Sequence, residues 1–406
     1  MSRAPKALAL AAAGIVACTD PAAPPTTLDP PDLRRAATRS LAPYDLGHLG
    51  GGSAIARDIN ALGVVVGSSM TESGEPHAFV WTRSGGMRDL GTLPGDTRSD
   101  ANAVNVYGEI VGTSGNRAVR WTRSGRIVPL EMPVNADYAV ATDINPTGLI
   151  SGYILLPPEL ASGTDARNLP VLWRARSRLQ LLEVPAPHHE GFAEAVNERG
   201  QVAATVGFDE IHTTRAARWH QRSGWLVIEP LQDDTRGTDL NERGDVVGFD
   251  LAVPYRPLPL IWPNGGARTE LPGLNGARGG YARGVNVNRQ VVGLAWVDEI
   301  GTTAGVVWDG RGVTPLPGLD GWDSFPNAIN EFGEAVGGSG PYAVIWTRRP
   351  VGVQADVRTV PGPALRVAGG GARAARLPAW LEAERRQCSR AGGVREWTSA
   401  ECLAAP

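Results

Sequence analysis

One short pattern, repeated seven times along the middle of the chain, most constrains its fold. An aliphatic residue and an asparagine are followed three residues later by glycine in every copy but the sixth. Successive asparagines lie 40 to 52 residues apart, and one tryptophan follows each in step. The asparagines are Asn60, Asn105, Asn145, Asn197, Asn241, Asn286 and Asn330, and the tryptophans are Trp81, Trp121, Trp173, Trp219, Trp262, Trp308 and Trp346. Two independent markers in one phase predict seven copies of one structural unit.

Each Asn-x-x-Gly has the residue types of a hairpin turn. Asparagine caps a type I turn through its side chain, and the glycine takes the positive φ that follows. The sixth copy has Arg289 at the glycine position, and we expect Asn288 to take the left-handed conformation there. After each turn, an apolar residue at the alternate position predicts a packed second strand. These residues are Val65, Ile110, Ile150, Val202, Val246, Val291 and Ala335.

A third strand is predicted to end at each tryptophan, as in residues 77–81, and a fourth follows a polar turn, as in residues 87–93. Four short strands in some forty residues match the size of a propeller blade. Glycine (51) and proline (32) are abundant, which favours many short strands joined by tight turns. The sequence therefore predicts an all-β fold, a seven-bladed β-propeller of four-stranded blades over residues 44–360.

The repeated words resemble those of the HAF family of bacterial extracellular repeats. They are Asp-Leu-Gly, Ile-Asn-x-x-Gly-x-Val-Val-Gly and His-Ala-Phe-x-Trp, and only the first copy spells His77-Ala78-Phe79 in full. The resemblance covers roughly residues 44 to 350. It implies an exported repeat protein and carries no functional residue over to this chain.

Residues 45–50, Asp-Leu-Gly-His-Leu-Gly, match the fourth-strand words near Asp89 but precede the first asparagine. We expect this N-terminal strand to complete the blade that contains Asn330 and Trp346, which would close the ring. The alternative is that the local segment 351–357 supplies the missing strand.

The N-terminus has the pattern of an export signal. Arg3 and Lys6 precede an apolar stretch, residues 7–17, that is too short to span a bilayer. Residues 15–18, Ile-Val-Ala-Cys, resemble the lipobox of bacterial lipoproteins, which implies cleavage after residue 17 and lipidation of Cys18. Thr19 follows in place of the aspartate that resembles an inner-membrane retention signal, so we expect the outer membrane. An ordinary cleavage site beside an incidental cysteine is the alternative.

Two further segments flank the predicted propeller. Residues 18–43 are rich in proline without hydrophobic periodicity, which predicts an extended tether. Residues 361–406 form a small C-terminal appendage. Cys388 and Cys402 are an even pair in an oxidising compartment once Cys18 is lipidated, which predicts one disulfide.

Charge and lysine content exclude some functions. The formal net charge of -3 gives no reason to expect a nucleic-acid partner. Lys6 is the sole lysine, so the exported chain has none for a Schiff base. No nucleophile elbow, metal-protease helix or sialidase-type Asp-box is present, and we predict no cofactor, no metal site and no specific catalytic residue.

The candidate ligand-binding residues each have a plainer structural interpretation. The seven phased tryptophans could stack on sugars, but their constant phase favours packing between blades. Trp225, Trp296 and Trp322 fall outside that phase and are better surface or loop candidates, although packing is still favoured over binding for them.

Two polar groups could hold a metal ion. Asp58, Asp143 and Asp239 lie two residues before their asparagines and could surround a hard cation near the axis, although turn capping or solvent exposure is the favoured interpretation. Residues 188–190, His-His-Glu, could bind a transition metal but are better interpreted as an exposed loop.

The sequence favours a monomeric, non-enzymatic binding or interaction scaffold on the cell envelope, with a polysaccharide or protein ligand. The long insertion of the third copy, residues 157–169, is its first candidate surface. The alternative is a loop-built enzyme, a hydrolase or lyase acting on polysaccharide. A ring of ionisable groups at the axis would favour the enzyme, and a plain polar funnel would favour binding.

Overall fold

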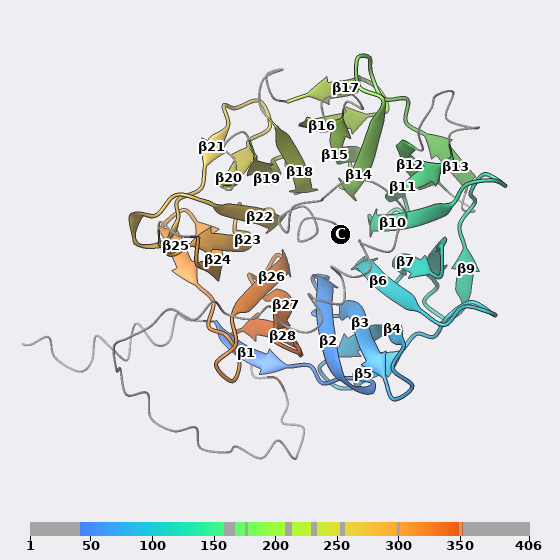
Figure 1. Cartoon of the computed structure of the whole chain (residues 1–406), viewed down its shortest axis with the longest axis horizontal. Coiled ribbons are helices and arrows are strands. Elements are labelled where there is room, and N and C mark those ends of the chain that lie inside the picture. Colours follow the sequence, from blue (N-terminus) through green and yellow to red (C-terminus); the bar gives the residue numbers. More distant parts are fainter. Residues whose placement is uncertain are drawn as a thin grey trace, which may run out of the picture. The chain divides into compact units, whose positions relative to one another are not determined.

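The computed structural model describes residues 41–157, 167–174, 178–207, 213–228, 234–251, 256–298, 301–348 and 351. These residues form seven four-stranded antiparallel sheets arranged in a ring, a seven-bladed β-propeller (Figure 1). The predicted fold class is confirmed. The described residues contain a single short 3₁₀ turn (Leu274–Gly276) and no helix that could cross a membrane.

The first and second strands of the blades lie nearest the axis (Figure 1). The first strands are β2 (Gly50–Ile59), β6 (Ser99–Val104), β10 (Tyr138–Ile144), β14 (Glu190–Val196), β18 (Thr235–Leu240), β22 (Gly280–Val285) and β26 (Ser324–Ile329). The second strands are β3 (Val65–Thr71), β7 (Ile110–Ser114), β11 (Ile150–Leu156), β15 (Gln201–Gly207), β19 (Val246–Asp250), β23 (Val291–Trp296) and β27 (Ala335–Ser339).

The third and fourth strands complete each blade on the outside. The third strands are β4 (Pro76–Thr82), β8 (Arg117–Trp121), β12 (Arg167–Arg174), β16 (Thr214–His220), β20 (Leu258–Trp262), β24 (Thr303–Asp309) and β28 (Tyr342–Thr347). The fourth strands are β5 (Gly86–Asp89), β9 (Ile127–Pro129), β13 (Arg178–Leu181), β17 (Gly224–Val227), β21 (Thr269–Glu270), β25 (Gly312–Pro315) and β1 (Ala42–Asp45). We number the blades 1 to 7 from β2 onward.

The ring closes through the N-terminal strand, as predicted. β1 pairs antiparallel with β28 in blade 7, so that Ala42 lies opposite Thr347. Leu46 is buried between blades 7 and 1. The strand begins at Ala42, two residues before the predicted boundary, and of residues 351–357 only Val351 is described.

The two ends of the ring differ. The hairpin turns between first and second strands and between third and fourth strands lie at one end, which we call the turn face. The connections between second and third strands and from one blade to the next lie at the opposite end, the loop face. Most of the third-copy insertion, residues 158–166, lies outside the described residues.

Seven apolar clusters form the core, and each joins two neighbouring blades. The phased tryptophans are buried in them, as predicted. Several also donate an indole hydrogen bond to a backbone carbonyl of the preceding blade, such as Trp121 to Leu90 at 3.1 Å and Trp346 to Pro317 at 2.7 Å. Burial and hydrogen bonding together explain the constant phase, because each indole fills the seam between two sheets.

A β-bulge recurs three residues before each asparagine, at Arg57 in blade 1 and Asn102 in blade 2. Opposite the bulge, the second strand has glycine in all blades except blade 4, which has Ala204. A Cβ at Gly112 would lie 1.9 Å from the carbonyl oxygen of Asp100. The bulge therefore explains the glycine of the Val-Val-Gly words.

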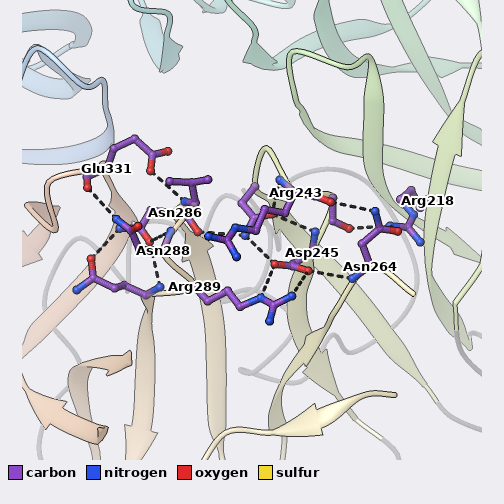
Figure 2. A network of polar contacts seen from close by, with 12 residues as sticks. Arg218, Arg243, Asp245, Asn264, Asn286, Asn288, Arg289 and Glu331 are labelled. Carbon is purple, nitrogen blue, oxygen red and sulfur yellow. Dashed lines mark hydrogen bonds and ion pairs between the residues drawn. The ribbon is translucent and has the colours of Figure 1, made fainter. Parts of the chain in front are cut away.

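The turn of the sixth copy corrects one prediction. Arg289 itself takes the left-handed conformation, at φ 58°, and Asn288 does not. The Arg289 side chain forms two bonds with the buried Asp245 of blade 5, at 2.7 and 3.0 Å (Figure 2). This bidentate pair offsets the strain of a non-glycine residue there, about 1 to 2 kcal/mol.

Deleting residues 42–49 removes β1 and the buried Leu46 and exposes the edge of β28. We expect the free energy of unfolding to fall by more than about 3 kcal/mol, measured by urea denaturation. Truncation after Val351 is the control and leaves the blade 7 sheet complete. An unchanged urea midpoint after the deletion would show that β1 does not close the ring.

Candidate functional site

The repeated asparagines form a closed ring of hydrogen bonds at the turn face. The side-chain nitrogen of each donates to the backbone carbonyl of the next asparagine, from Asn60 to Asn105 at 2.9 Å and around to Asn330, which returns to Asn60 at 3.2 Å. The intervening bonds measure 2.9 to 3.3 Å. The sequence identified these asparagines as turn caps but not as links between blades.

The same side chains also hold the turns. The Asn145 Oδ1 accepts backbone hydrogen bonds from Thr147 and Leu149, both at 3.0 Å, and the other copies repeat this geometry. Glycine takes a positive φ in every copy but the sixth, as predicted. Each asparagine therefore satisfies its own turn and the neighbouring blade at once.

A second ring of polar contacts lies at the bulges. Asn102, Thr142 and Thr238 each donate to a backbone carbonyl of the next blade, at 2.6 to 3.0 Å. Asn327 donates to Ala56 at 2.8 Å across the closure of the ring. Three blades carry a charged residue at this position instead.

The charged bulge residues are Arg57, Glu194 and Arg283, on blades 1, 4 and 6. Arg57 bonds Asp100 of blade 2 at 3.3 Å, and Arg283 bonds Asn327 of blade 7 at 2.7 Å. Glu194 interacts electrostatically with Arg236 of blade 5. Structural repetition does not require charge here, since asparagine or threonine serves in the other blades.

Two residues before each bulge, the first strands carry a second variable position. Its occupants are partly exposed on the strands that line the axis and include three aromatic residues, one acid and one arginine (Figure 1). They are Ile55, Asp100, Val140, Phe192, Arg236, Tyr281 and Phe325. We call these residues together with Arg57, Glu194 and Arg283 the axis site.

Aromatic contacts fix two of these side chains. The ring of Phe192 packs edge-on against that of Tyr153, with 4.9 Å between the ring centroids. The rings of Tyr281 and Phe249 pack in the same way, with 5.0 Å between their centroids. Burial raises the pKa of Tyr153, and the charges of Glu194 and Arg57 also act on it. Groups from blades 1, 3 and 4 thus share one electrostatic environment around the axis.

Two arginines of the axis site have unused donors. The Nε atoms of Arg57 and Arg236 are buried and have no hydrogen-bond partner among the described residues. Burying such a donor without an acceptor costs about 1 to 3 kcal/mol. An acceptor supplied by a bound ligand would recover this free energy.

Glu194 has an unusual protonation equilibrium. Burial raises the pKa of its carboxyl group to about 7, and the positive charge of Arg236 opposes that rise. A carboxyl group that titrates near neutral pH can bind a polar group in either protonation state or exchange protons with it.

Asp58, Asp143 and Asp239 join blades in pairs. Each accepts two backbone hydrogen bonds, one from the next residue and one from the following blade, as Asp143 does from Ile144 at 2.7 Å and Val196 at 2.8 Å. Asp58 reaches Val104 and Asp239 reaches Val285 in the same way, both at 2.8 Å. These bonds hold amides of the first strands, one in the same blade and one in the next, and none goes to a turn residue, so the aspartates link blades and do not cap the turns as expected.

No group of histidine, cysteine and acidic residues with metal-binding geometry occurs in the described part of the chain. Within that part of the chain, neither the three aspartates nor residues 188–190 form such a group. His188 is buried, not exposed as expected, and burial lowers its pKa.

The off-phase tryptophans differ from one another. Trp225 is half-buried on β17 and donates to the Glu183 carbonyl. Trp296 is buried, which fits packing and not a surface site, and the Arg256 guanidinium carbon lies 5.8 Å from its ring centroid. Trp322 is 46% exposed on the loop face, as expected of a surface residue. Cys18, Cys388 and Cys402 lie outside the described residues.

No family model matches the sequence, and no curated protein matches it. Solved structures show where the fold recurs. A streptogramin B lyase is 10% identical with a TM-score of 0.51 over 75% of this chain and 96% of that chain. The virginiamycin B lyase from Staphylococcus aureus is 12% identical, with a TM-score of 0.51 over 75% of this chain and 98% of that chain.

A puromycin hydrolase is 14% identical, with a TM-score of 0.52 over 79% of this chain and 58% of that chain. At these identities the similarity shows the propeller fold alone. The axis site must therefore be interpreted from its own residues.

Replacing Asn145 by Asp retains an acceptor for its turn but removes the donor to Asn197. We expect Asn145→Asp to lower the free energy of unfolding by about 1 to 3 kcal/mol. Asn145→Ala loses the turn bonds as well and should cost more. Urea denaturation compares them, and an Asp variant as stable as the wild type would contradict the role of the ring.

The interblade aspartates predict a pH dependence of stability. Burial raises the pKa of Asp58 to about 6 and that of Asp143 to about 7, and the pKa of Asp239 rises as well. Because the folded state holds these protons more tightly than the unfolded chain, their contribution to stability is lost as pH rises from about 4 through 7. We expect a decrease on the order of 1 kcal/mol per residue.

Urea denaturation of wild type and Asp143→Asn between pH 4 and 7.5 measures this dependence. The variant loses one backbone hydrogen bond, so it starts less stable at low pH. The difference between the two proteins should narrow as pH rises. A difference that widens with pH would show that the Asp143 carboxylate stabilises the fold in its charged form.

Proposed function

We propose that this protein is a lipid-anchored envelope protein whose propeller binds an oligosaccharide or peptide ligand with acidic groups at the axis site. The buried Nε donors of Arg57 and Arg236 are the observation that carries the proposal, because their unmet hydrogen bonds call for an acceptor. Carboxylate oxygens are the acceptors that arginine prefers.

The aromatic residues of the axis site support the same class of ligand. Phe192, Tyr281 and Phe325 are partly exposed at equivalent positions of three blades, and aromatic faces pack on the apolar faces of sugar rings. Variation is concentrated at these positions, whereas the asparagines and tryptophans that hold the ring together are uniform. A rigid scaffold with one variable surface suits binding.

The anchor and the export route remain part of the proposal. The sequence of residues 1–18 supports a signal peptide and a lipid on Cys18, and the resemblance to HAF repeats supports an extracellular location. The residue after Cys18 is Thr19 and not the aspartate of an inner-membrane retention signal, so we propose the outer membrane.

A second candidate function is catalysis on the same ligand, as a polysaccharide hydrolase or lyase. Ionisable groups do line the axis, and Glu194 has a pKa of about 7 beside Arg236, as a general acid or base would need. Against it, the three aspartates near the axis are each engaged by two backbone bonds. The ionisable groups at the axis favour the enzyme by the criterion drawn from the sequence, whereas the engaged aspartates and the aromatic residues of the axis site favour binding.

The test is a glycan array probed with the full mature chain carrying Cys18→Ser. We expect binding of acidic oligosaccharides, and Arg236→Gln should weaken it about tenfold, the equivalent of one charge-assisted hydrogen bond. Arg222→Gln, an exposed arginine on the turn face, is the matched control. Equal affinity of Arg236→Gln and wild type would place the ligand elsewhere.

Analysis of the bound glycans for cleavage products separates the binding scaffold from the enzyme. Cleavage that Glu194→Gln abolishes, while affinity remains, would establish the enzyme. Binding without cleavage would establish the scaffold.

A further inference from the structure

Three large apolar side chains are exposed at equivalent positions of three consecutive blades. Leu62, Tyr107 and Phe332 each lie two residues after a ring asparagine, on blades 1, 2 and 7, with 71%, 59% and 60% of their surface exposed. Blade 7 lies beside blade 1 because the ring closes there (Figure 1). We call these three residues the apolar arc. The other blades carry Thr147, Arg199, Arg243 and Asn288 at this position.

Exposed arginines occupy the same face. The hairpin turns of the turn face carry arginines whose side chains are exposed to solvent on blades 2, 4, 5 and 6. They are Arg123, Arg126, Arg199, Arg222, Arg243 and Arg311. With Arg83, Arg268 and Arg289 included, arginines outnumber acidic residues on the described turns. Asp245 and Glu334 among the acids are buried and paired with arginine, whereas Glu198 and Glu331 are exposed. The apolar arc therefore shares its face with positive charge.

The loop face has the opposite charge. Among its described connections, acidic residues outnumber Arg98, Arg256 and Arg278. They are Glu72, Glu75, Asp96, Glu131, Asp137, Glu183, Asp234, Asp298, Asp320 and Asp323. The described turns and connections are thus electrically polarised along the axis, with the positive end at the turn face.

The chain also enters the propeller at the turn face. Ala42 pairs with Thr347 at the end of β28 where the hairpin turns lie, and β1 runs from there toward the loop face. The segment that precedes Leu41 therefore joins blade 7, the blade that carries Phe332. A lipid on Cys18 would therefore be connected to the propeller through a residue on this face.

We infer that the turn face docks on a lipid bilayer with anionic headgroups, so that the loop face and its acidic connections point away from the membrane. The inference rests on the lipid anchor of the proposed function. Exposed Leu, Tyr and Phe side chains insert at the headgroup boundary, and arginines nearby attract anionic lipids. The attachment of the tether at the same face favours a bilayer over a protein partner as the occupant, because a lipid on Cys18 would hold this face close to the membrane.

Vesicle sedimentation tests the surface without its lipid. The full mature chain with Cys18→Ser is mixed with vesicles of phosphatidylcholine alone or with phosphatidylglycerol added. We expect binding to the anionic vesicles that weakens at high salt, and the triple variant Leu62→Ser, Tyr107→Ser, Phe332→Ser should lower the partition coefficient at least about tenfold.

The double variant Val134→Ser, Trp322→Ser is the matched control, because it removes exposed apolar side chains from the loop face. Its partition coefficient should equal that of the parent. Thermal melting confirms that each variant is folded. If the triple variant binds as well as the control, or if the parent ignores anionic vesicles, the turn face is not a membrane surface.

Orientation is measured on the lipidated protein with a single introduced amine. Because Lys6 is the only lysine and lies in the predicted signal peptide, the mature chain has no lysine to react. Ser124 on the turn face and Ser73 on the loop face are matched sites, since each is exposed and bonds a threonine two residues before it. Mass spectrometry reports the labelling by a water-soluble amine reagent.

With the protein on vesicles, labelling of Ser124→Lys should fall several-fold relative to protein in detergent, while Ser73→Lys stays unchanged. The reverse pattern, or equal labelling of both, would overturn the orientation. Failure of the anchor would appear separately, as wild type and Cys18→Ser partitioning alike between detergent and water. The vesicle assay with Cys18→Ser still tests the turn face in that case.

Discussion

The hydrogen bond from one asparagine side chain to the next asparagine's backbone holds the geometry of this propeller together. It binds neighbouring blades at the turn face, while the apolar clusters bind them farther out. No blade can bury its faces alone, so every sheet depends on two neighbours and the set is complete only as a circle. The strand β1 closes that circle by pairing the first described residues with the last blade.

The positions that hold the blades together are uniform between repeats, whereas the positions around the axis vary. Asparagine, tryptophan and glycine repeat because the seams and bulges demand them. The bulge position needs only a side chain that reaches the next blade, which asparagine, threonine, arginine or glutamate can do. Residue types therefore vary at the bulge position and two residues before it, and charged and aromatic residues occur there around the axis. The two faces differ for a related reason, since short turns and long connections alternate along every blade.

The periodic features were predictable from the sequence because they are local. The blade count, the turns, the tryptophan positions and the closing strand all follow from spacing within one repeat. The asparagine ring was missed because its partners are one full repeat apart, although the invariant residue was visible. The ion pair of Arg57 with Asp100 depends on the bulge, which no single repeat reveals. Arg289 takes the place of the expected glycine because its ion pair with Asp245 of another blade compensates for the strain, which the local sequence does not reveal. The burial of Trp296 and His188 was not predicted either.

Native-state hydrogen exchange tests the closed ring most directly. The amides of Leu46 and Ala54 donate to the carbonyls of Ala343 and Pro341 across the junction of the N-terminal segment with blade 7, at 2.9 Å each. A ring that unfolds as one unit predicts that they exchange with the same opening free energy as core amides of blades 3 and 4. Exchange at the junction with a clearly lower opening free energy would show an open arc of blades, and would contradict the account.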